Sequence, residues 1–384
     1  MREFFCLQKH LKIYVNGAII VIKRRLIFVY ISDTLEKRGV PSLLEFSDGR
    51  KVTSDNADER RAEIREILQR EIYGKMPPKP DFVRGEIIEK PKSRDCAGKA
   101  QIKKILLTVS VVGNEYSFPI WLVMPKNIAR PRFVVFLNFR PNLPDEYLPC
   151  EELIDRGIGF AAVCYKDVTS DDGDFSNGIA DALAKCGYTD TGKLAMWGYT
   201  ASRILDYVLE NEEIDTDHIA VAGHSRLGKT ALVAACFDER FTCAYSNDSG
   251  CSGAAITRGK AGETVEFITK TFPFWFCKKY REYSGRHDAL PFDQHYLIAS
   301  IAPRKVYVAS AVEDEWADPE SEYLSLCAAS DFWSLYGKGT FTPVERAPIV
   351  GDVIQGESLG YHLRSGVHFL SREDWNKFID FFLK

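Results

Sequence analysis

Residues 219–232 read IAVAGHSRLGKTAL, and this segment indicates the fold class of the chain. Its first five residues are apolar, as in a buried β-strand, and the residues from Arg226 onward favour a helix. Ser225 lies in the turn between them, close to Gly223 and Gly228. A strand, a sharp turn that carries a serine and a helix form a nucleophile elbow, and small glycines let such a strained turn pack. Because the spacing is GxSxxG and not GxSxG, an ordinary strand–helix turn with a capping serine is the alternative.

Other short apolar runs predict further strands of the same sheet. They show no polar alternation, which is typical of parallel strands that are covered on both faces. These runs are residues 133–138, 158–164, 241–246 and 305–310. Amphipathic stretches predict helices over residues 194–210, 226–237 and 371–383, and Ser371 is the expected N-cap of the last.

The chain before residue 130 has a different pattern. Residues 58–73 predict an amphipathic surface helix, and residues 104–112 and 118–123 predict an antiparallel hairpin around Gly113–Asn114. No repeat or low-complexity linker divides the chain. We therefore predict one α/β-hydrolase domain over residues 32–384, with a mostly parallel central sheet, an antiparallel N-terminal edge and helices on both faces.

The first residues are expected to lie outside this domain. Residues 13–31 are strongly apolar, but Lys23, Arg24 and Arg25 interrupt them, so the stretch is too short to span a membrane. It also lacks the small-residue cleavage site of a signal peptide. We predict that residues 1–31 form an extension outside the main fold, with an export signal as the alternative.

Composition excludes several classes of protein. The chain has 384 residues, and its 50 basic and 54 acidic side chains give a formal net charge of −4. Without a basic excess, no nucleic-acid partner is expected, and no membrane partner is expected either. The ten cysteines form no CxxC pair and most lie in apolar runs, which indicates free thiols in a reducing compartment. We therefore predict a cytoplasmic protein, no metal site and no cofactor.

A serine nucleophile needs an imidazole base and an acid that orients it, in the chain order Ser, Asp or Glu, His. His368 lies in a flexible Ser-Gly-Val-His segment before the C-terminal helix and is the predicted base, whereas His362 and His295 are expected to be structural. Two acids compete: Asp314 follows the predicted strand 305–310, and Asp248 ends the strand 241–246. Both strands open on the same edge of the sheet, so both acids stay candidates.

Several linked motifs resemble the glucuronoyl esterases of carbohydrate esterase family 15, over roughly residues 130–384. The sequences of the elbow and of the DEWADPE loop are most similar to those of bacterial relatives often called acetyl xylan esterases. The shared motifs are Ser225-Arg226-x-Gly228-Lys229, Ser249-Gly250-x-x-Gly253-Ala254-Ala255, Pro291-Phe-Asp-Gln-His-Tyr-Leu, Ala302-Pro303-Arg304 and Trp316-x-x-Pro319-Glu320.

The resemblance implies a role for each matching residue. Ser225 would be the nucleophile and His368 the base, and the Arg226 side chain would help to stabilise the oxyanion. Lys229 would bind the uronate sugar and Trp316 would form a wall of the sugar site. From the fold, a second backbone N–H that donates to the oxyanion is expected around Phe139–Arg140. Helical spacing alone would make Lys229 an ordinary surface residue.

Family members commonly have a glutamate at the end of the strand after the nucleophile helix, where this chain has Asp248, and others place the acid on the later loop, here at Asp314. The family's usual cysteine before the serine is His224 here, which suggests a missing disulfide.

These features predict a serine carbohydrate esterase. Its expected substrate is a carbohydrate ester, namely a 4-O-methyl-glucuronoyl ester of a hemicellulose fragment. The alternatives are an acetyl xylan esterase, which differs in the side of the ester that the sugar supplies, and a non-catalytic binding protein of the same fold.

Overall fold

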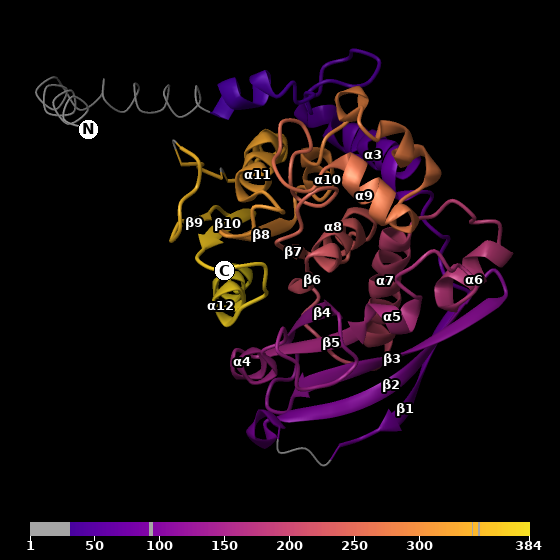
Figure 1. Ribbon diagram of the computed structural model, residues 1–384. Coiled ribbons are helices and arrows are strands. Elements are labelled where there is room, and N and C mark those ends of the chain that lie inside the picture. Colours follow the sequence, from indigo (N-terminus) through magenta and orange to yellow (C-terminus); the bar gives the residue numbers. More distant parts are fainter. Residues whose placement is uncertain (1–30, 92–94, 340, 345) are drawn as a thin grey trace, which may run out of the picture.

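The computed structural model describes residues 31–91, 95–339, 341–344 and 346–384. Its centre is a twisted ten-stranded sheet with the order β1-β2-β3-β5-β4-β6-β7-β8-β10-β9 (Figure 1). The strands are β1 Phe82–Glu89, β2 Ala100–Val111, β3 Asn114–Pro125, β4 Arg132–Asn138, β5 Ile158–Cys164, β6 Ile219–His224, β7 Cys243–Asn247, β8 Lys305–Ala311, β9 Val353–Gln355 and β10 Leu359–Arg364. From β5 to β10 the neighbouring strands are parallel, whereas β1, β2, β3 and β9 pair in the antiparallel sense. The predicted α/β-hydrolase architecture is confirmed.

Helices cover both faces of the sheet (Figure 1). They are α3 Ala57–Leu68, α4 Cys150–Asp155, α5 Tyr165–Val168, α6 Gly178–Lys185, α7 Lys193–Asn211, α8 Arg226–Phe237, α9 Val265–Thr271, α10 His295–Ala299, α11 Pro319–Ser334 and α12 Arg372–Phe382. Helices α7 and α8 pack on one face, and α4 and α12 pack on the other. Alternate residues of one strand therefore enter separate cores, as Val135 and Phe136 of β4 do.

The predicted segments agree with these elements to within a few residues. Strand β5 and helix α8 have the predicted bounds, and Ser371 caps α12 by accepting a hydrogen bond from the Asp374 N–H. The hairpin of β2 and β3 turns one residue earlier than predicted, because Val112 and Gly113 adopt φ values of 50° and 73°. Helix α3 ends at Leu68 and continues as a π-helical turn over Gln69–Tyr73.

The start of the chain is described only from residue 31. Ile31 is buried in the core on the α7 and α8 side, so the packed structure already includes it. The rest of the predicted extension, residues 1–30, lies outside the described residues. No helix in the described ranges is both long and apolar enough to cross a membrane.

This topology gathers chemically reactive side chains at one edge of the sheet. Strands β6, β7 and β8 run in parallel, so their carboxyl ends meet at the same edge. Ser225 follows β6, Asp248 follows β7 and Asp314 comes shortly after β8. His368 lies in the loop between β10, which is parallel to β8, and α12.

Candidate active site

Ser225 occupies a strained turn between β6 and α8. Its φ and ψ angles are 56° and −128°, a conformation that non-glycine residues rarely adopt. The Ser225 N–H donates a hydrogen bond of 2.8 Å to the carbonyl of Asn247 in β7, which fixes the turn to the neighbouring strand. A Cβ atom at Gly223 would lie 2.2 Å from the carbonyl oxygen of Leu227, so only glycine fits there. The GxSxxG segment is thus a nucleophile elbow in geometry, and the Arg226 N–H begins the helix beside it.

His368 is hydrogen-bonded to Asp314. The distance from its Nδ1 to Asp314 Oδ2 is 2.5 Å, and Asp314 also accepts a bond of 3.1 Å from the Ala317 N–H. The Asp314 side chain is 4% exposed and the His368 side chain 44% exposed. A buried carboxylate therefore holds one ring nitrogen of an imidazole that is partly open to solvent.

The surroundings of Asp314 favour its charged form. Burial alone would raise the pKa of Asp314, but the hydrogen bond and charge of His368 and the Ala317 N–H outweigh burial and lower it. An ionised Asp314 fixes the Nδ1–H tautomer of His368, which leaves Nε2 free to accept a proton.

The imidazole of His368 lies beside the elbow. Its ring centroid is 4.4 Å from that of His224, the residue directly before Ser225. The Ser225 hydroxyl and His368 make no hydrogen bond within the described residues. Such bonds are often long in enzymes without substrate and shorten when substrate binds.

Asp248 has a different environment from Asp314. Its Oδ1 accepts a 2.8 Å bond from the Ala311 N–H, and its Oδ2 lies 3.6 Å from an Arg364 nitrogen. Burial first, and then the negative charge of Glu322 and of other carboxylates, raises the pKa of Asp248 well above its usual value. One donor atom each from Asp248, Asp314 and His368 lies within 4.8 Å of the other two, but the imidazole is bonded to Asp314. Both predicted acids therefore lie near the base, and Asp314 is the one in contact with it.

The guanidinium of Arg226 is held by Asp171, a residue that the sequence reading missed. Arg226 Nη1 bonds to Asp171 Oδ2, and Asp171 also accepts bonds from Trp275 Nε1 at 2.7 Å and from the Tyr165 hydroxyl at 2.8 Å. The guanidinium carbon lies 4.8 Å from the centroid of the Trp275 ring and 5.9 Å from that of Phe139. This packing fixes the arginine next to the elbow. In the sequence, only the position of Arg226 directly after Ser225 indicated its role.

Of the two backbone N–H groups expected as a second oxyanion donor, one is already hydrogen-bonded. The Phe139 N–H donates a bond of 2.8 Å to Oδ1 of Asn138, so it is occupied. The Arg140 N–H is the remaining candidate in the predicted Phe139–Arg140 pair. The Arg140 side chain is paired with Asp145 and orders this loop.

Lys229 is buried, which corrects its interpretation as a surface helix residue. Its ammonium bonds to the Ser249 carbonyl and lies 3.1 Å from Oε2 of Glu263. The side chains of Lys229 and Glu263 are 5% and 9% exposed. The acidic partner expected for a buried lysine is therefore Glu263, which the sequence reading did not identify.

Trp316 lies next to this ion pair. Its carbonyl accepts a 3.0 Å bond from the Glu263 N–H, and its half-exposed indole packs edge-to-face on Phe267 at 4.8 Å. The backbone contact brings the predicted sugar wall and the Lys229–Glu263 pair together, although Lys229 lies in α8 and Glu263 and Trp316 lie in two separate loops.

The two histidines predicted to be structural are buried in the fold. His362 bonds through Nε2 to Asp374 and through Nδ1 to the Tyr307 hydroxyl, both at 2.9 Å. His295 Nε2 bonds to the Pro41 carbonyl at 2.8 Å, and burial lowers the pKa of His295 to about 4. Both therefore have packing partners away from Ser225.

The cysteines found in the described ranges are free thiols. His224, in the position of the family cysteine, instead bonds through Nδ1 to Asn247 Oδ1 at 2.6 Å.

The sequence of the chain is similar to those of known carbohydrate esterases. A family model described as glucuronyl esterase of fungi matches residues 107–337. The chain is 33% identical to a carbohydrate esterase from an unknown prokaryotic organism, over 92% of this chain and 91% of that one. It is 29% identical to a 4-O-methyl-glucuronoyl methylesterase of Podospora anserina, over 76% of this chain and 59% of the fungal one.

Solved structures agree with these relatives. A promiscuous family 15 carbohydrate esterase from a marine bacterial metagenome superposes with a TM-score of 0.81 at 31% identity, over 89% of this chain and 96% of that one. A glucuronoyl esterase from Solibacter usitatus gives the same TM-score of 0.81 and 31% identity, over 90% and 97% of the two chains.

Proposed function

Because the chain belongs to carbohydrate esterase family 15, the glucuronoyl esterases, we propose that it uses Ser225, His368 and Asp314 to hydrolyse esters of a glucuronate carboxyl group. The protein is a serine-type carboxylic ester hydrolase. We propose 4-O-methyl-glucuronoyl esters of hemicellulose fragments as its substrates, which the names of its fungal relatives support.

The chemistry follows from the geometry of the loops. Ser225 Oγ attacks the ester carbonyl while His368 Nε2 takes its proton, and Asp314 stabilises the resulting imidazolium through Nδ1–H. The Arg226 N–H donates to the oxyanion, with its guanidinium close by. His368 then gives the proton to the leaving alkoxide, and an acyl-enzyme forms. Water, deprotonated by His368, attacks this ester and releases the uronic acid and free Ser225.

Sugar recognition falls to the residues beside the elbow. Lys229 is one helical turn after Ser225, so its ammonium is placed to donate to hydroxyl groups of the sugar, and Glu263 is placed to accept from them. Trp316 offers a half-exposed indole as a wall for the ring. These groups fit the hydroxyls and the apolar face of a pyranose, and the names of the fungal relatives favour a sugar on the acyl side of the ester.

The observation that carries the proposal is the 2.5 Å bond between His368 and Asp314 next to the strained Ser225 turn. The test compares hydrolysis of benzyl glucuronate with hydrolysis of an acetylated xylo-oligosaccharide. We expect a higher kcat/KM for the glucuronate ester and loss of activity in Ser225→Ala. Activity on the acetylated substrate alone would replace the proposal with the acetyl xylan esterase alternative.

The cytoplasmic location stays a prediction. Measuring the esterase activity in separate cell fractions tests it, because most activity in the medium would contradict it.

A further inference from the structure

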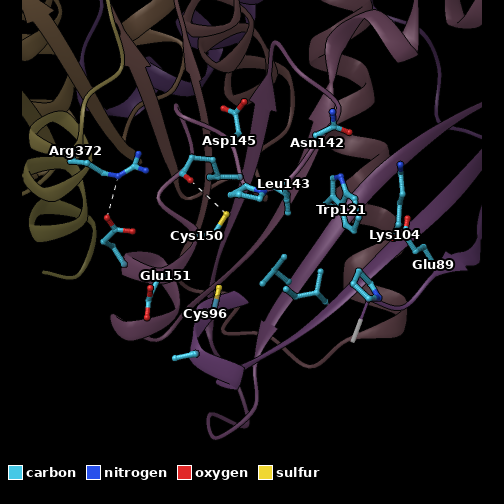
Figure 2. A pocket seen from close by; sticks show the side chains of 17 residues that line it. Glu89, Cys96, Lys104, Trp121, Asn142, Leu143, Asp145, Cys150, Glu151 and Arg372 are labelled. Carbon is cyan, nitrogen blue, oxygen red and sulfur yellow. Dashed lines mark hydrogen bonds and ion pairs between the residues drawn. The ribbon is translucent and has the colours of Figure 1, made fainter. Parts of the chain in front are cut away.

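The cavity of Figure 2 lies apart from the Ser225 loops and has a volume of about 790 Å³. Its walls come from strands β1 to β3, from Pro91, Cys96 and Ala97 between β1 and β2, from the loop between β4 and α4, and from the first residues of α4 and α12. This volume falls within the range of small-molecule sites. None of Ser225, His368, Asp314, Lys229 or Trp316 lines the cavity.

An ammonium lies over an indole in the wall of this cavity, because Lys104 and Trp121 are paired across strands β2 and β3. Trp121 is half-buried, and its Nε1 donates a bond of 2.8 Å to the Pro141 carbonyl, which fixes the ring plane. Lys104 Nζ lies 5.1 Å from the centroid of the Trp121 ring, and no ion pair of Lys104 is formed within the described residues. Figure 2 shows Lys104 beside Trp121 at the same end of the cavity as Glu89. This end combines an aromatic surface with a hydrogen-bond donor and an acceptor.

The charges around the cavity are largely balanced. Glu151 lies 3.6 Å from Lys99, and Glu152 lies 3.1 Å from Arg372. Figure 2 shows Arg372 at the end of the cavity opposite to Lys104. Asp145 is paired with Arg140 outside the cavity lining. Lys104 and Glu89 are left and have opposite signs, and Lys104 also interacts electrostatically with Asp167 of the adjoining narrow space. A strongly charged ligand of either sign would gain little here, so the cavity favours a neutral ligand that carries many hydroxyl groups.

The position of the cavity connects it to the reaction site. Its wall includes Asn142 and Leu143, in the same loop as Phe139 and Tyr147, and both of these rings contact His224. A much narrower space of about 10 Å³ continues from Trp121 toward Asn138. The side-chain nitrogen of Asn138 is buried there without a hydrogen-bond partner in the described part of the chain. The cavity therefore adjoins the loop behind the elbow without opening into the Ser225 site through a wide channel.

We propose that this cavity is a second carbohydrate site that binds neutral sugar units of a glycan, with one ring packed against the Trp121 indole next to the Lys104 ammonium, which bonds to its hydroxyls. The apolar C–H face of a pyranose matches the indole, and its hydroxyls match the polar groups around it. The choice of a glycan rests on the proposed function, because a carbohydrate ester substrate has neutral sugars next to its uronate. The site would hold a neutral part of the glycan on the enzyme, apart from the loops that carry Ser225.

The test is calorimetric titration of the full chain, carrying Ser225→Ala, with xylohexaose, a neutral linear oligosaccharide. We expect binding that weakens about tenfold in Trp121→Ala and several-fold in Lys104→Gln, as for central contact residues. Lys104→Gln is a mild change that decides the question if Trp121→Ala does not fold. Lys103→Gln is the matched control, because Lys103 is adjacent in β2 but pairs with Glu212 at 2.6 Å. It should leave the affinity unchanged.

A parallel Trp316→Ala variant separates this cavity from the Ser225 site. Absence of binding at millimolar xylohexaose, or weakening by Trp316→Ala alone, would overturn the second site. Either result would leave the proposed function standing, because that function is measured separately as hydrolysis of benzyl glucuronate by the unmodified enzyme. If the unmodified enzyme did not hydrolyse benzyl glucuronate but xylohexaose still bound in the cavity, only the proposed function would be overturned.

Discussion

Asp314 Oδ2 lies 2.5 Å from His368 Nδ1, whereas the neighbouring Asp248 is bonded to the Ala311 N–H and faces Arg364. Two carboxylates thus stand close to one imidazole in different states. The low pKa of Asp314 keeps it charged, and the raised pKa of buried Asp248 favours its neutral form. A charged partner stabilises an imidazolium more strongly than a neutral one, which assigns the orienting role to Asp314.

The first prediction separates these two acids. Asp314→Asn should lower kcat by about 10³–10⁴-fold, because an amide no longer fixes the productive tautomer of His368 or stabilises its charge. Asp248→Asn should lower kcat by less than about tenfold, since the amide oxygen can still accept from Ala311. Steady-state kinetics on benzyl glucuronate measure both. The reverse order of effects would make Asp248 the orienting acid.

The second prediction concerns Arg226 and the contacts with Asp171 and Trp275 that hold its guanidinium. Arg226→Ala should lower kcat by about 10²-fold with little change in KM, as for loss of one oxyanion donor. Asp171→Asn should give a smaller loss, because the guanidinium keeps its contact with Trp275 but loses its charged partner. Arg226→Lys serves as the control that keeps the charge without the planar group. An unchanged kcat in Arg226→Ala would mean that the side chain only packs.

The third prediction uses the buried pair of Lys229 and Glu263. Lys229→Met should destabilise the fold by about 3 kcal/mol, because it leaves a buried carboxylate without its cation. The double variant with Glu263→Gln should recover much of that stability, yet both variants should show a raised KM for a glucuronate ester. Urea unfolding and kinetics together check this. Restored KM in the double variant would show that the pair has a structural role only.

The fourth prediction concerns His224, whose ring lies 4.4 Å from that of His368. Burial, followed by the charge of His368, lowers the pKa of His224 to about 3, so His224 is a neutral ring against the base. A neutral ring does not repel the imidazolium that forms on His368 and holds that ring in place by packing, so His224→Ala should lower kcat by about fivefold, which corresponds to about 1 kcal/mol of activation free energy. His224→Phe, which keeps a ring, should retain more activity. Equal losses in the two variants would contradict a role for the ring.

The fifth prediction is a pH dependence of stability. Burial raises the pKa of Glu322 from 4.5 to about 7, although the side chain accepts bonds from Ser310 and from the Ser249 and Gly250 N–H groups. Between these pH values the folded protein holds a proton that the unfolded chain has lost, so stability falls as pH rises. Relative to Glu322→Gln, the free energy of unfolding should fall by about 3 kcal/mol over this range. Urea unfolding at about pH 5 and about pH 8 measures it, and parallel curves for the two proteins would contradict it.

The sequence predicted the features that depend on neighbouring residues. The apolar run of β6, the glycines of the elbow and the helix formers of α8 are contiguous, so Ser225 was placed correctly on its turn. The choice between Asp248 and Asp314 depends on which carboxylate faces the imidazole, and two parallel strands that open on one edge give the same sequence signal. Asp171 and Glu263 were missed because each meets its partner only after loops distant in sequence pack together. Helical spacing alone also gave a wrong prediction for Lys229, namely a surface position, because the loop around Glu263 covers it.

The most direct test of the account is mass-spectrometric mapping of the full chain after reaction with a fluorophosphonate probe, which labels serines activated by a neighbouring base. We predict a single adduct, on the peptide that contains Ser225, at a rate that falls sharply in His368→Ala. An unlabelled protein, or an adduct whose rate does not depend on His368, would contradict a nucleophile at Ser225 and the esterase mechanism built on it.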